Sequence, residues 1–221
     1  AGCYYNQKKY DKAVADLERA LEIKPEHAEL HWNRYLLYSK LEQTDNAITA
    51  LQDAIELDAG LTKAYRTLAS IYADCDDESY RDPEAAVELA FKAVTLAPDD
   101  SFAKSVLGLA YYRSGDFREA ATILKTAAES LDADKAWTLL FLSMSHWQLG
   151  NHDVARSWYE RFTEWIKTHE HELDDYVVRI RLEAEELMGV DDSDSDELRQ
   201  DLQDEQNVNP LDPKDPVKKD R

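Results

Sequence analysis

Two histidines four residues apart, His27 and His31, are the best candidates for metal ligands in this 221-residue chain. At the start of a helix this spacing can place two imidazoles on one face, as a zinc site requires. A nearby glutamate would have to supply a third ligand, and solvated or half-buried histidines are far more common on helices. His169 and His171 are a weaker pair, because residues two apart face different sides of a helix. The sequence therefore predicts no metal site.

Signals of catalysis are also missing from the sequence. The six glycines form no phosphate-binding loop, and no segment resembles the catalytic or magnesium-binding motifs of protein kinases. The paired acids Glu185 and Glu186 lie in an amphipathic helical pattern, where charged faces are the norm. The acidic run 191–205 lacks the spaced glycine of a calcium loop. We expect no enzyme activity and no cofactor in this chain.

The charge balance restricts the kinds of partner. Lys plus Arg number 26 and Asp plus Glu number 46, which gives a formal net charge of −20. Such a chain repels nucleic-acid backbones and anionic membrane surfaces, so a protein or peptide partner is expected. No apolar run is long enough to span a membrane. The only cysteines, Cys3 and Cys75, are far apart, which favours a reducing, cytoplasmic location.

One short phrase recurs along the chain at a spacing of about 34 residues. It consists of small and apolar residues at helical spacing, as in Ala13-x3-Leu17-x2-Ala20, and begins again at Ala47, Ala86, Ala120 and Ala155. Period and phrase are similar to those of the tetratricopeptide repeat, a helix–turn–helix unit. Stacks of such units form binding surfaces. The phrase therefore predicts an all-α, right-handed solenoid of helical hairpins.

Apolar periodicity and turn residues place the elements of this solenoid. After a helix that starts at Tyr10 and stops before Pro25, helices are expected at about 28–42, 45–58, 62–74, 83–97, 101–114, 117–131, 136–149 and 152–169. The repeats are then about 1–27, 28–61, 62–100, 101–135 and 136–169, so that 1–169 is the array. Residues 170–189 read as a capping helix, and 190–221 as a disordered acidic tail.

The first repeat reads as truncated. Tyr4 matches the tyrosine near the end of a repeat's first helix, so most of that helix would precede Ala1. The apolar face of Tyr4, Tyr10 and Leu17 would then be open, and two copies of the chain could associate through it.

Three stretches carry a narrower resemblance: CDDESYRDPEAAVELAFKAVTLAP, LLFLSMSHWQLGNHDVARSWYERFTEW and RIRLEAEELMG. Together, over about residues 63–190, they resemble tetratricopeptide arrays at the C-terminal end of large bacterial multidomain proteins. Such arrays often accompany a Ser/Thr protein kinase domain or a WD-repeat region. The resemblance implies a non-catalytic region of a larger signalling or scaffolding protein.

The first helices of stacked repeats line the concave face of such an array. The residues expected on that face offer aromatic and apolar anchors and a small basic rim that could hold one carboxylate; they are Trp32, Leu36, Lys63, Arg66, Phe102, Leu109, Tyr112, Arg113, Trp137, Leu140, Met144 and Trp147. Several of these, above all Leu109 and Trp147, could instead pack one repeat against the next.

The sequence thus predicts a protein–protein interaction scaffold that binds a peptide or a partner helix in the concave groove. Two alternatives stay open. The array could dock on a catalytic domain of its own protein, or assemble with a second copy. It could also shape the active site of a hydrolase or transferase whose catalytic residues lie upstream.

Overall fold

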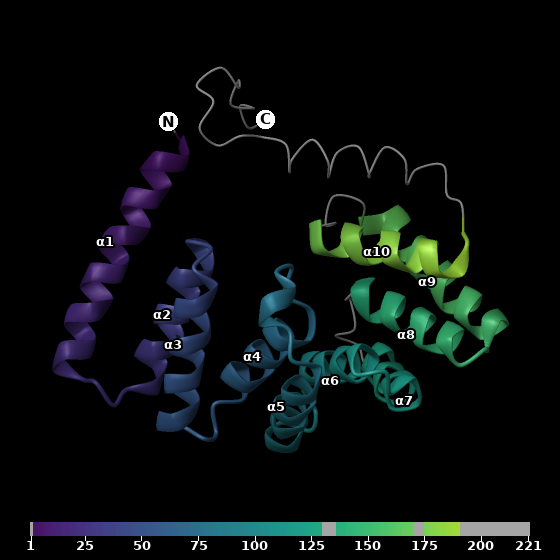
Figure 1. The fold of residues 1–221 in the computed structure, drawn as a ribbon, viewed down its shortest axis with the longest axis horizontal. Coiled ribbons are helices and arrows are strands. Elements are labelled where there is room, and N and C mark those ends of the chain that lie inside the picture. The colour runs from purple at the N-terminus through teal and green to yellow at the C-terminus, as the bar shows by residue number, and fades with distance from the viewer. Residues whose placement is uncertain (1, 130–135, 170–174, 191–221) are drawn as a thin grey trace. The chain divides into compact units, whose positions relative to one another are not determined.

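The computed structural model describes residues 2–129, 136–169 and 175–190, and every regular element in these ranges is helical (Figure 1). The predicted all-α fold is confirmed. The chain forms two compact units, residues 1–134 (unit 1) and 135–221 (unit 2), which we describe one at a time. Of the predicted tail 190–221, all but Val190 lies outside the described residues.

Unit 1 consists of α1 and three helical hairpins. Its elements are α1 (Gly2–Ile23), α2 (Ala28–Lys40), α3 (Thr44–Leu57), α4 (Thr62–Asp74), the 3₁₀ helix η1 (Glu78–Tyr80), α5 (Pro83–Leu96), α6 (Ser101–Arg113) and α7 (Phe117–Ala128). Within each hairpin the two helices pack along their length, α2 on α3, α4 on α5 and α6 on α7. The predicted boundaries of these hairpins are correct to within three residues.

Unit 2 continues the hairpin pattern with α8 (Ala136–Gln148) and α9 (His152–His169), followed by α10 (Asp175–Met188), which packs on α8. Helix α10 corresponds to the predicted capping helix. It buries Ile180 and Ala184 completely. No helix in the described ranges is long and apolar enough to cross a membrane.

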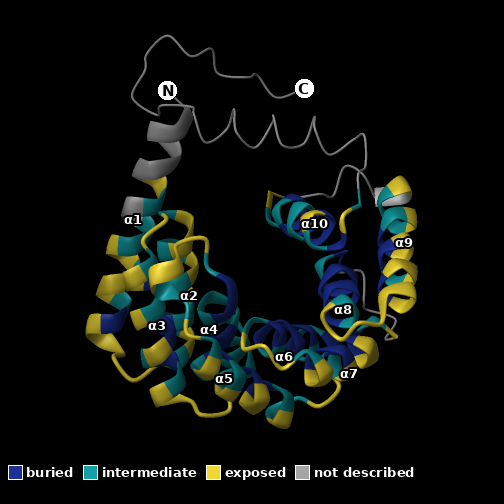
Figure 2. Ribbon diagram, turned by 45° about the vertical axis from the view of Figure 1, so that its right-hand side comes forward, coloured by how far each residue is buried: buried dark blue, intermediate teal, exposed yellow. Residues whose placement is uncertain are grey.

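Small residues of the repeated phrase form the core between helices. Ala54, Ala86, Ala90, Ala93 and Ala120 have no exposed surface. Figure 2 shows the buried residues concentrated on α6, whereas α3 and α5 present many exposed residues. Small side chains let two helix backbones approach closely, while leucines such as Leu51 and Leu124, also without exposed surface, fill the remaining space.

The first helix differs from the prediction. A turn was expected between Tyr4 and Tyr10, but α1 runs without a break from Gly2 to Ile23. Later hairpins turn at Gly115 (φ 89°) and Gly150 (φ 77°), in the left-handed region that favours glycine. At the matching place α1 has Gln7 and Lys8 instead of a glycine. Nothing there favours a left-handed residue, so the helix continues.

The turn between α2 and α3 is closed by Glu42, which has φ 57° although it is not glycine. Such a backbone costs a residue with a Cβ roughly 1 kcal/mol. We therefore expect Glu42→Gly to raise the free energy of unfolding by about 0.5–1 kcal/mol, measured by urea denaturation followed by circular dichroism.

Gly115→Ala is the matched control for this prediction. A Cβ there would meet no atom within 4 Å, so the change tests backbone conformation alone. It should lower stability by about 1 kcal/mol. A Glu42→Gly variant less stable than the parent would contradict the argument.

Candidate functional site

In unit 1 the first helices of the hairpins, α2, α4 and α6, carry aromatic and basic residues that meet between successive repeats. The Lys63 Nζ lies 4.8 Å from the centre of the Trp32 ring and 2.6 Å from Glu29 Oε2. Trp32 and Glu29 are both on α2, three residues apart and therefore on one face. Lys63 on α4 thus bridges to the preceding repeat through a carboxylate and a ring.

Arg66 makes the same kind of contact with the following repeat. Its guanidinium lies 4.8 Å from the centre of the Phe102 ring, and its Nη1 is 2.5 Å from Asp100 Oδ2. The other carboxylate oxygen of Asp100 accepts a hydrogen bond from the Ala103 backbone N–H at 3.1 Å, which caps α6. Asp100 therefore caps the N-terminus of α6 and also pairs with Arg66 of the preceding repeat.

The third cation, Arg113 on α6, pairs with a buried carboxylate. Arg113 Nη2 lies 2.8 Å from Asp74 Oδ1, and the guanidinium lies 5.5 Å from the centre of the Tyr112 ring. The Asp74 side chain is only 1% exposed, compared with 51% for Glu29 and 22% for Asp100. The Arg113–Asp74 pair therefore lies inside the repeat junction, whereas the carboxylates paired with Lys63 and Arg66 are partly exposed.

These pairs change the expected role of the basic rim. The sequence predicts cations that could hold a partner's carboxylate, but each of the three already has a carboxylate within 3 Å. An incoming carboxylate must displace one of them. The accessible part of the face offers aromatic rings, the exposed Leu36 and paired charges in place of a positive rim.

Several residues predicted on the binding face belong to the core. Leu109 is 1% exposed, and Leu140 and Met144 have no exposed surface. These three side chains are therefore not accessible to a partner in this structure. Tyr112 is buried as well, at 8% exposure, with its ring 5.5 Å from that of Phe117 on α7.

The two tryptophans of unit 2 that were predicted on the binding face, Trp137 and Trp147, contact neighbouring aromatic rings. The Trp137 ring makes edge contacts with Phe141, at 6.2 Å between centres, and with Tyr176 of α10, at 6.4 Å. The Trp147 ring lies 4.1 Å from His152, in the turn between α8 and α9. Trp32, Leu36, Lys63, Arg66 and Phe102 remain as the accessible predicted residues of unit 1, and we call them the α2–α4–α6 face.

His31, one of the two histidines considered as metal ligands, makes contacts within the fold. His31 is buried, with Nε2 2.9 Å from the Pro25 carbonyl oxygen and Nδ1 3.3 Å from Asp53 Oδ2. Arg34 shares the same Asp53 carboxylate. His31 therefore connects the chain before α2 with α3. Among the described residues no group of three potential metal ligands comes together.

The sequence reasoning missed the acidic partners of these cations, Glu29, Asp74 and Asp100. The period contained the signal, because Glu29 and Lys63 are one repeat apart, as are Arg66 and Asp100. Opposite charges at that separation face each other when repeats stack.

Comparison with known proteins supports this architecture. Residues 3–41 match the TPR repeat pattern, and residues 28–60 and 105–165 match tetratricopeptide repeat patterns. The chain is 27% identical to the human protein O-mannosyl-transferase TMTC1 over 169 residues and 29% identical to tetratricopeptide repeat protein 37 of Xenopus laevis over 159 residues. These matches cover 74% and 69% of this chain but only 18% and 10% of the relatives.

Solved structures show the same fold. The MamA protein aligns with a TM-score of 0.62 at 20% identity, covering 77% of this chain and 90% of MamA. PilW, a type IV pilus biogenesis factor, aligns with a TM-score of 0.60 at 18% identity, covering 94% of this chain and 90% of PilW. Repeat period, helical hairpins and these matches lead to one assignment: the chain is a tetratricopeptide-repeat protein.

Proposed function

We propose that this chain is a non-catalytic protein–protein interaction scaffold that binds a peptide or a partner helix on the α2–α4–α6 face. The observation that supports this most is the pair of rings Trp32 on α2 and Phe102 on α6, each covered by a cation from α4. Aromatic side chains beside arginine or lysine are typical anchors of interfaces.

The pairing of the cations indicates what the partner offers. Because Lys63 and Arg66 are neutralised by Glu29 and Asp100, the attraction for a terminal carboxylate is weak. Apolar or aromatic side chains can instead insert beside the rings and next to Leu36, which is 44% exposed. The partner segment is therefore expected to be apolar along this face, as in helix-in-groove recognition.

The wider setting belongs to the same proposal. The chain spans less than a fifth of the curated relatives it matches, so we propose that it works as the interaction region of a larger, multidomain protein. The resemblance over residues 63–190 and the two distant cysteines favour a bacterial protein in the cytoplasm as that setting. Binding partners would then be brought to activities located elsewhere in that protein.

Alanine substitution of the rings tests the face. In a peptide-array screen, Trp32→Ala and Phe102→Ala should each weaken the best-binding peptides about tenfold or more, the effect of losing an interface anchor of 1.4 kcal/mol or above. Fluorescence anisotropy with the selected peptides gives the dissociation constants.

Phe91→Ala is the matched control for the ring substitutions. Phe91 is 59% exposed but lies on α5, outside the α2–α4–α6 face. The same peptides should bind this variant as they bind the parent. The proposed face is wrong if the two ring variants also retain full affinity for every selected peptide.

A further inference from the structure

A second surface of unit 1 is hollowed between α3 and α5, away from the α2–α4–α6 face. At its apolar end a pocket of about 600 Å³ has Leu68 of α4 as its floor and Ile55 of α3 and Leu89 of α5 as its walls. Leu68 is 3% exposed, and Ile55 and Leu89 pack half-buried against the same core cluster. This volume lies in the range of ligand sites, about 300–1,000 Å³.

Two further hollows with acidic lining residues lie next to this pocket and form the acidic end. The pocket shares Tyr72 with a neighbouring hollow at the start of α3, and that hollow shares Asp45 and Tyr80 with a third one. Gln52 Nε2 donates a hydrogen bond to the Tyr72 hydroxyl at 3.2 Å, at the junction of the two ends. We call the three connected hollows the α3–α5 trough.

The segment between α4 and α5, residues 75–82, builds the acidic end. The segment between α4 and α5 forms η1, and Asp77 and Tyr80 from it line the trough opposite Asp45. The Asp82 backbone N–H donates to the Tyr72 carbonyl oxygen at 2.8 Å, which ties the end of this segment to α4. This segment therefore forms one wall of the trough.

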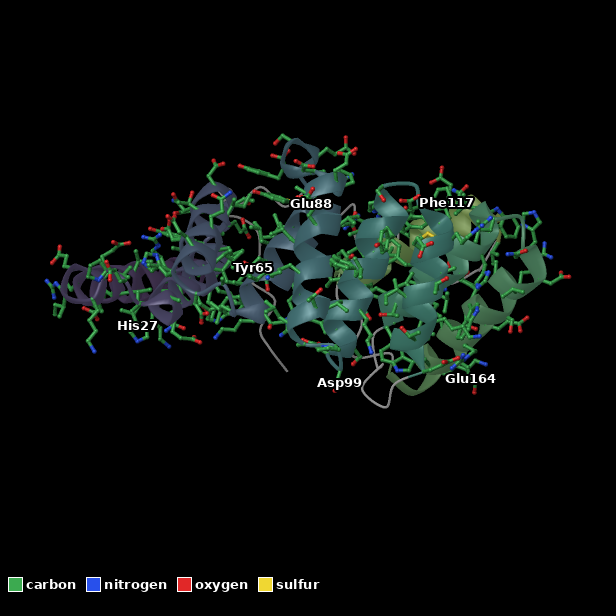
Figure 3. All side chains as sticks on the ribbon, turned by 90° about the horizontal axis from the view of Figure 1, so that it is seen from below. His27, Tyr65, Glu88, Asp99, Phe117 and Glu164 are labelled. Carbon is green, nitrogen blue, oxygen red and sulfur yellow. The ribbon has the colours of Figure 1, made fainter. Side chains whose placement is uncertain are left out.

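Charge identifies the kind of occupant. Glu42, Asp45, Asp77 and Asp82 line the acidic end. The one basic residue lining it, Arg81, is engaged by Glu78 at 3.0 Å and by the Cys75 carbonyl oxygen at 2.7 Å. At the apolar end exposed Glu56 and Glu88 face a single lysine, Lys92. Figure 3 labels Glu88 on α5 and Tyr65, which lines the same pocket from α4.

We propose that the α3–α5 trough is a second docking site, which takes a protein segment with apolar anchors followed by lysine or arginine residues. The anchors fill the pocket between Ile55 and Leu89, and the basic residues lie along Asp45 and Asp77. From Asp45 to Glu56 helix α3 rises about 16 Å, so the segment is about three turns long if it is helical. This site is independent of the α2–α4–α6 face.

Charge reversal at the rim tests the trough without disturbing its floor. The probe is a fluorescein-labelled 16-residue helical peptide with leucines on two successive turns and lysines on the next, read by fluorescence anisotropy in 150 mM NaCl. Glu42→Lys with Asp45→Lys should weaken its binding about tenfold, because both exposed charges at the end that takes the lysines change sign. Circular dichroism confirms that the variant is folded.

The control carries the same change of net charge elsewhere. Glu160→Lys with Glu186→Lys reverses two exposed glutamates of unit 2, on α9 and α10, and should leave the affinity within about twofold of the parent. Trp32→Ala should also leave it unchanged, so that failure of the trough and failure of the α2–α4–α6 face are told apart.

Three results would overturn the proposal. The double variant in the trough and the double variant in unit 2 could weaken binding equally, which would mean that the basic probe is attracted to the acidic chain in general. A probe with glutamates in place of the lysines could bind as well as the basic probe. Light scattering could show a dimer of the parent that Glu42→Lys with Asp45→Lys dissociates, which would make a second copy of the chain the occupant.

Discussion

Glu185→Ala is expected to lower the free energy of unfolding of unit 2 by about 3–5 kcal/mol, the cost of leaving a buried charge without its partner. Glu185 is 1% exposed and Arg181 is 5% exposed, and both lie on α10. The Arg181 Nε donates to Glu185 Oε1 at 2.7 Å, and the Tyr159 hydroxyl of α9 donates to the same oxygen at 2.6 Å. Removing the carboxylate deprives a buried guanidinium and a buried phenol of the acceptor that they share.

The pKa shifts of Tyr159 and Arg181 have their origin in burial and in the same contacts with Glu185. Burial raises the pKa of Tyr159, and the hydrogen bond to the charged Glu185 raises it further, so the phenol keeps its proton and donates. Burial alone lowers the pKa of Arg181, but its hydrogen bond to Glu185 and the attraction to that charge outweigh burial and raise the pKa. The hydrogen bond from the Tyr159 phenol to Glu185 therefore links α9 to α10, and Arg181 donates to the same carboxylate from within α10.

Tryptophan fluorescence during urea denaturation measures this effect, because four of the five tryptophans, residues 137, 147, 158 and 165, are in unit 2. Glu186→Ala is the control, since the neighbouring Glu186 is exposed, and it should change stability by less than about 0.5 kcal/mol. Glu185→Leu combined with Arg181→Met should recover most of the loss, because an apolar pair replaces the ionic one. An alanine variant as stable as the parent would contradict the assignment.

Gly108→Ala is expected to lower the stability of unit 1 by about 2–3 kcal/mol. A Cβ on Gly108 would lie 2.3 Å from Leu124 Cγ and 2.6 Å from Leu124 Cδ2, far inside contact distance. Both residues are buried where α6 crosses α7. Alanine favours a helix over glycine by about 1 kcal/mol, so the measured loss comes in spite of better helix propensity.

A double-mutant cycle separates the clash from other effects. In the Gly108→Ala background, Leu124→Ala should cost less than it does in the parent, because it also removes the clash. Gly60→Ala is the control: its Cβ would meet only the Asp58 side chain, at 3.2 Å, which can turn aside. If the Gly108→Ala variant has the same urea midpoint as the parent, α6 and α7 can move apart to accommodate the added Cβ, and the prediction is wrong.

Periodicity predicted the hairpins well because it depends on local physics. Asp82 and Pro83 predict the start of α5, and the Asp82 side chain does accept from the Ala85 backbone N–H at 3.0 Å. Gly115 and Gly150 end α6 and α8 as their freedom to adopt positive φ predicts. Each of these features is decided by residues within one turn of each other.

The site was harder to predict, because its state depends on neighbours one repeat away. Lys63 and Arg66 read as available cations until Glu29 and Asp100 are placed beside them. Arg181 and Glu185, four residues apart, have the spacing of a solvated surface pair, and only the packing of α10 buries them. A helical pattern shows which residues share a face, but not what covers that face.

The inter-repeat contacts of unit 1 also bear on how the chain folds. Lys63 with Glu29 and Arg66 with Asp100 each close a loop of 34 residues, and the helices that pack belong to the same or to adjacent repeats. Loops this short cost little closure entropy, so contact order is low and folding is fast. A hairpin needs only its neighbour to become stable, and the array can therefore assemble stepwise while its chain is still being synthesised.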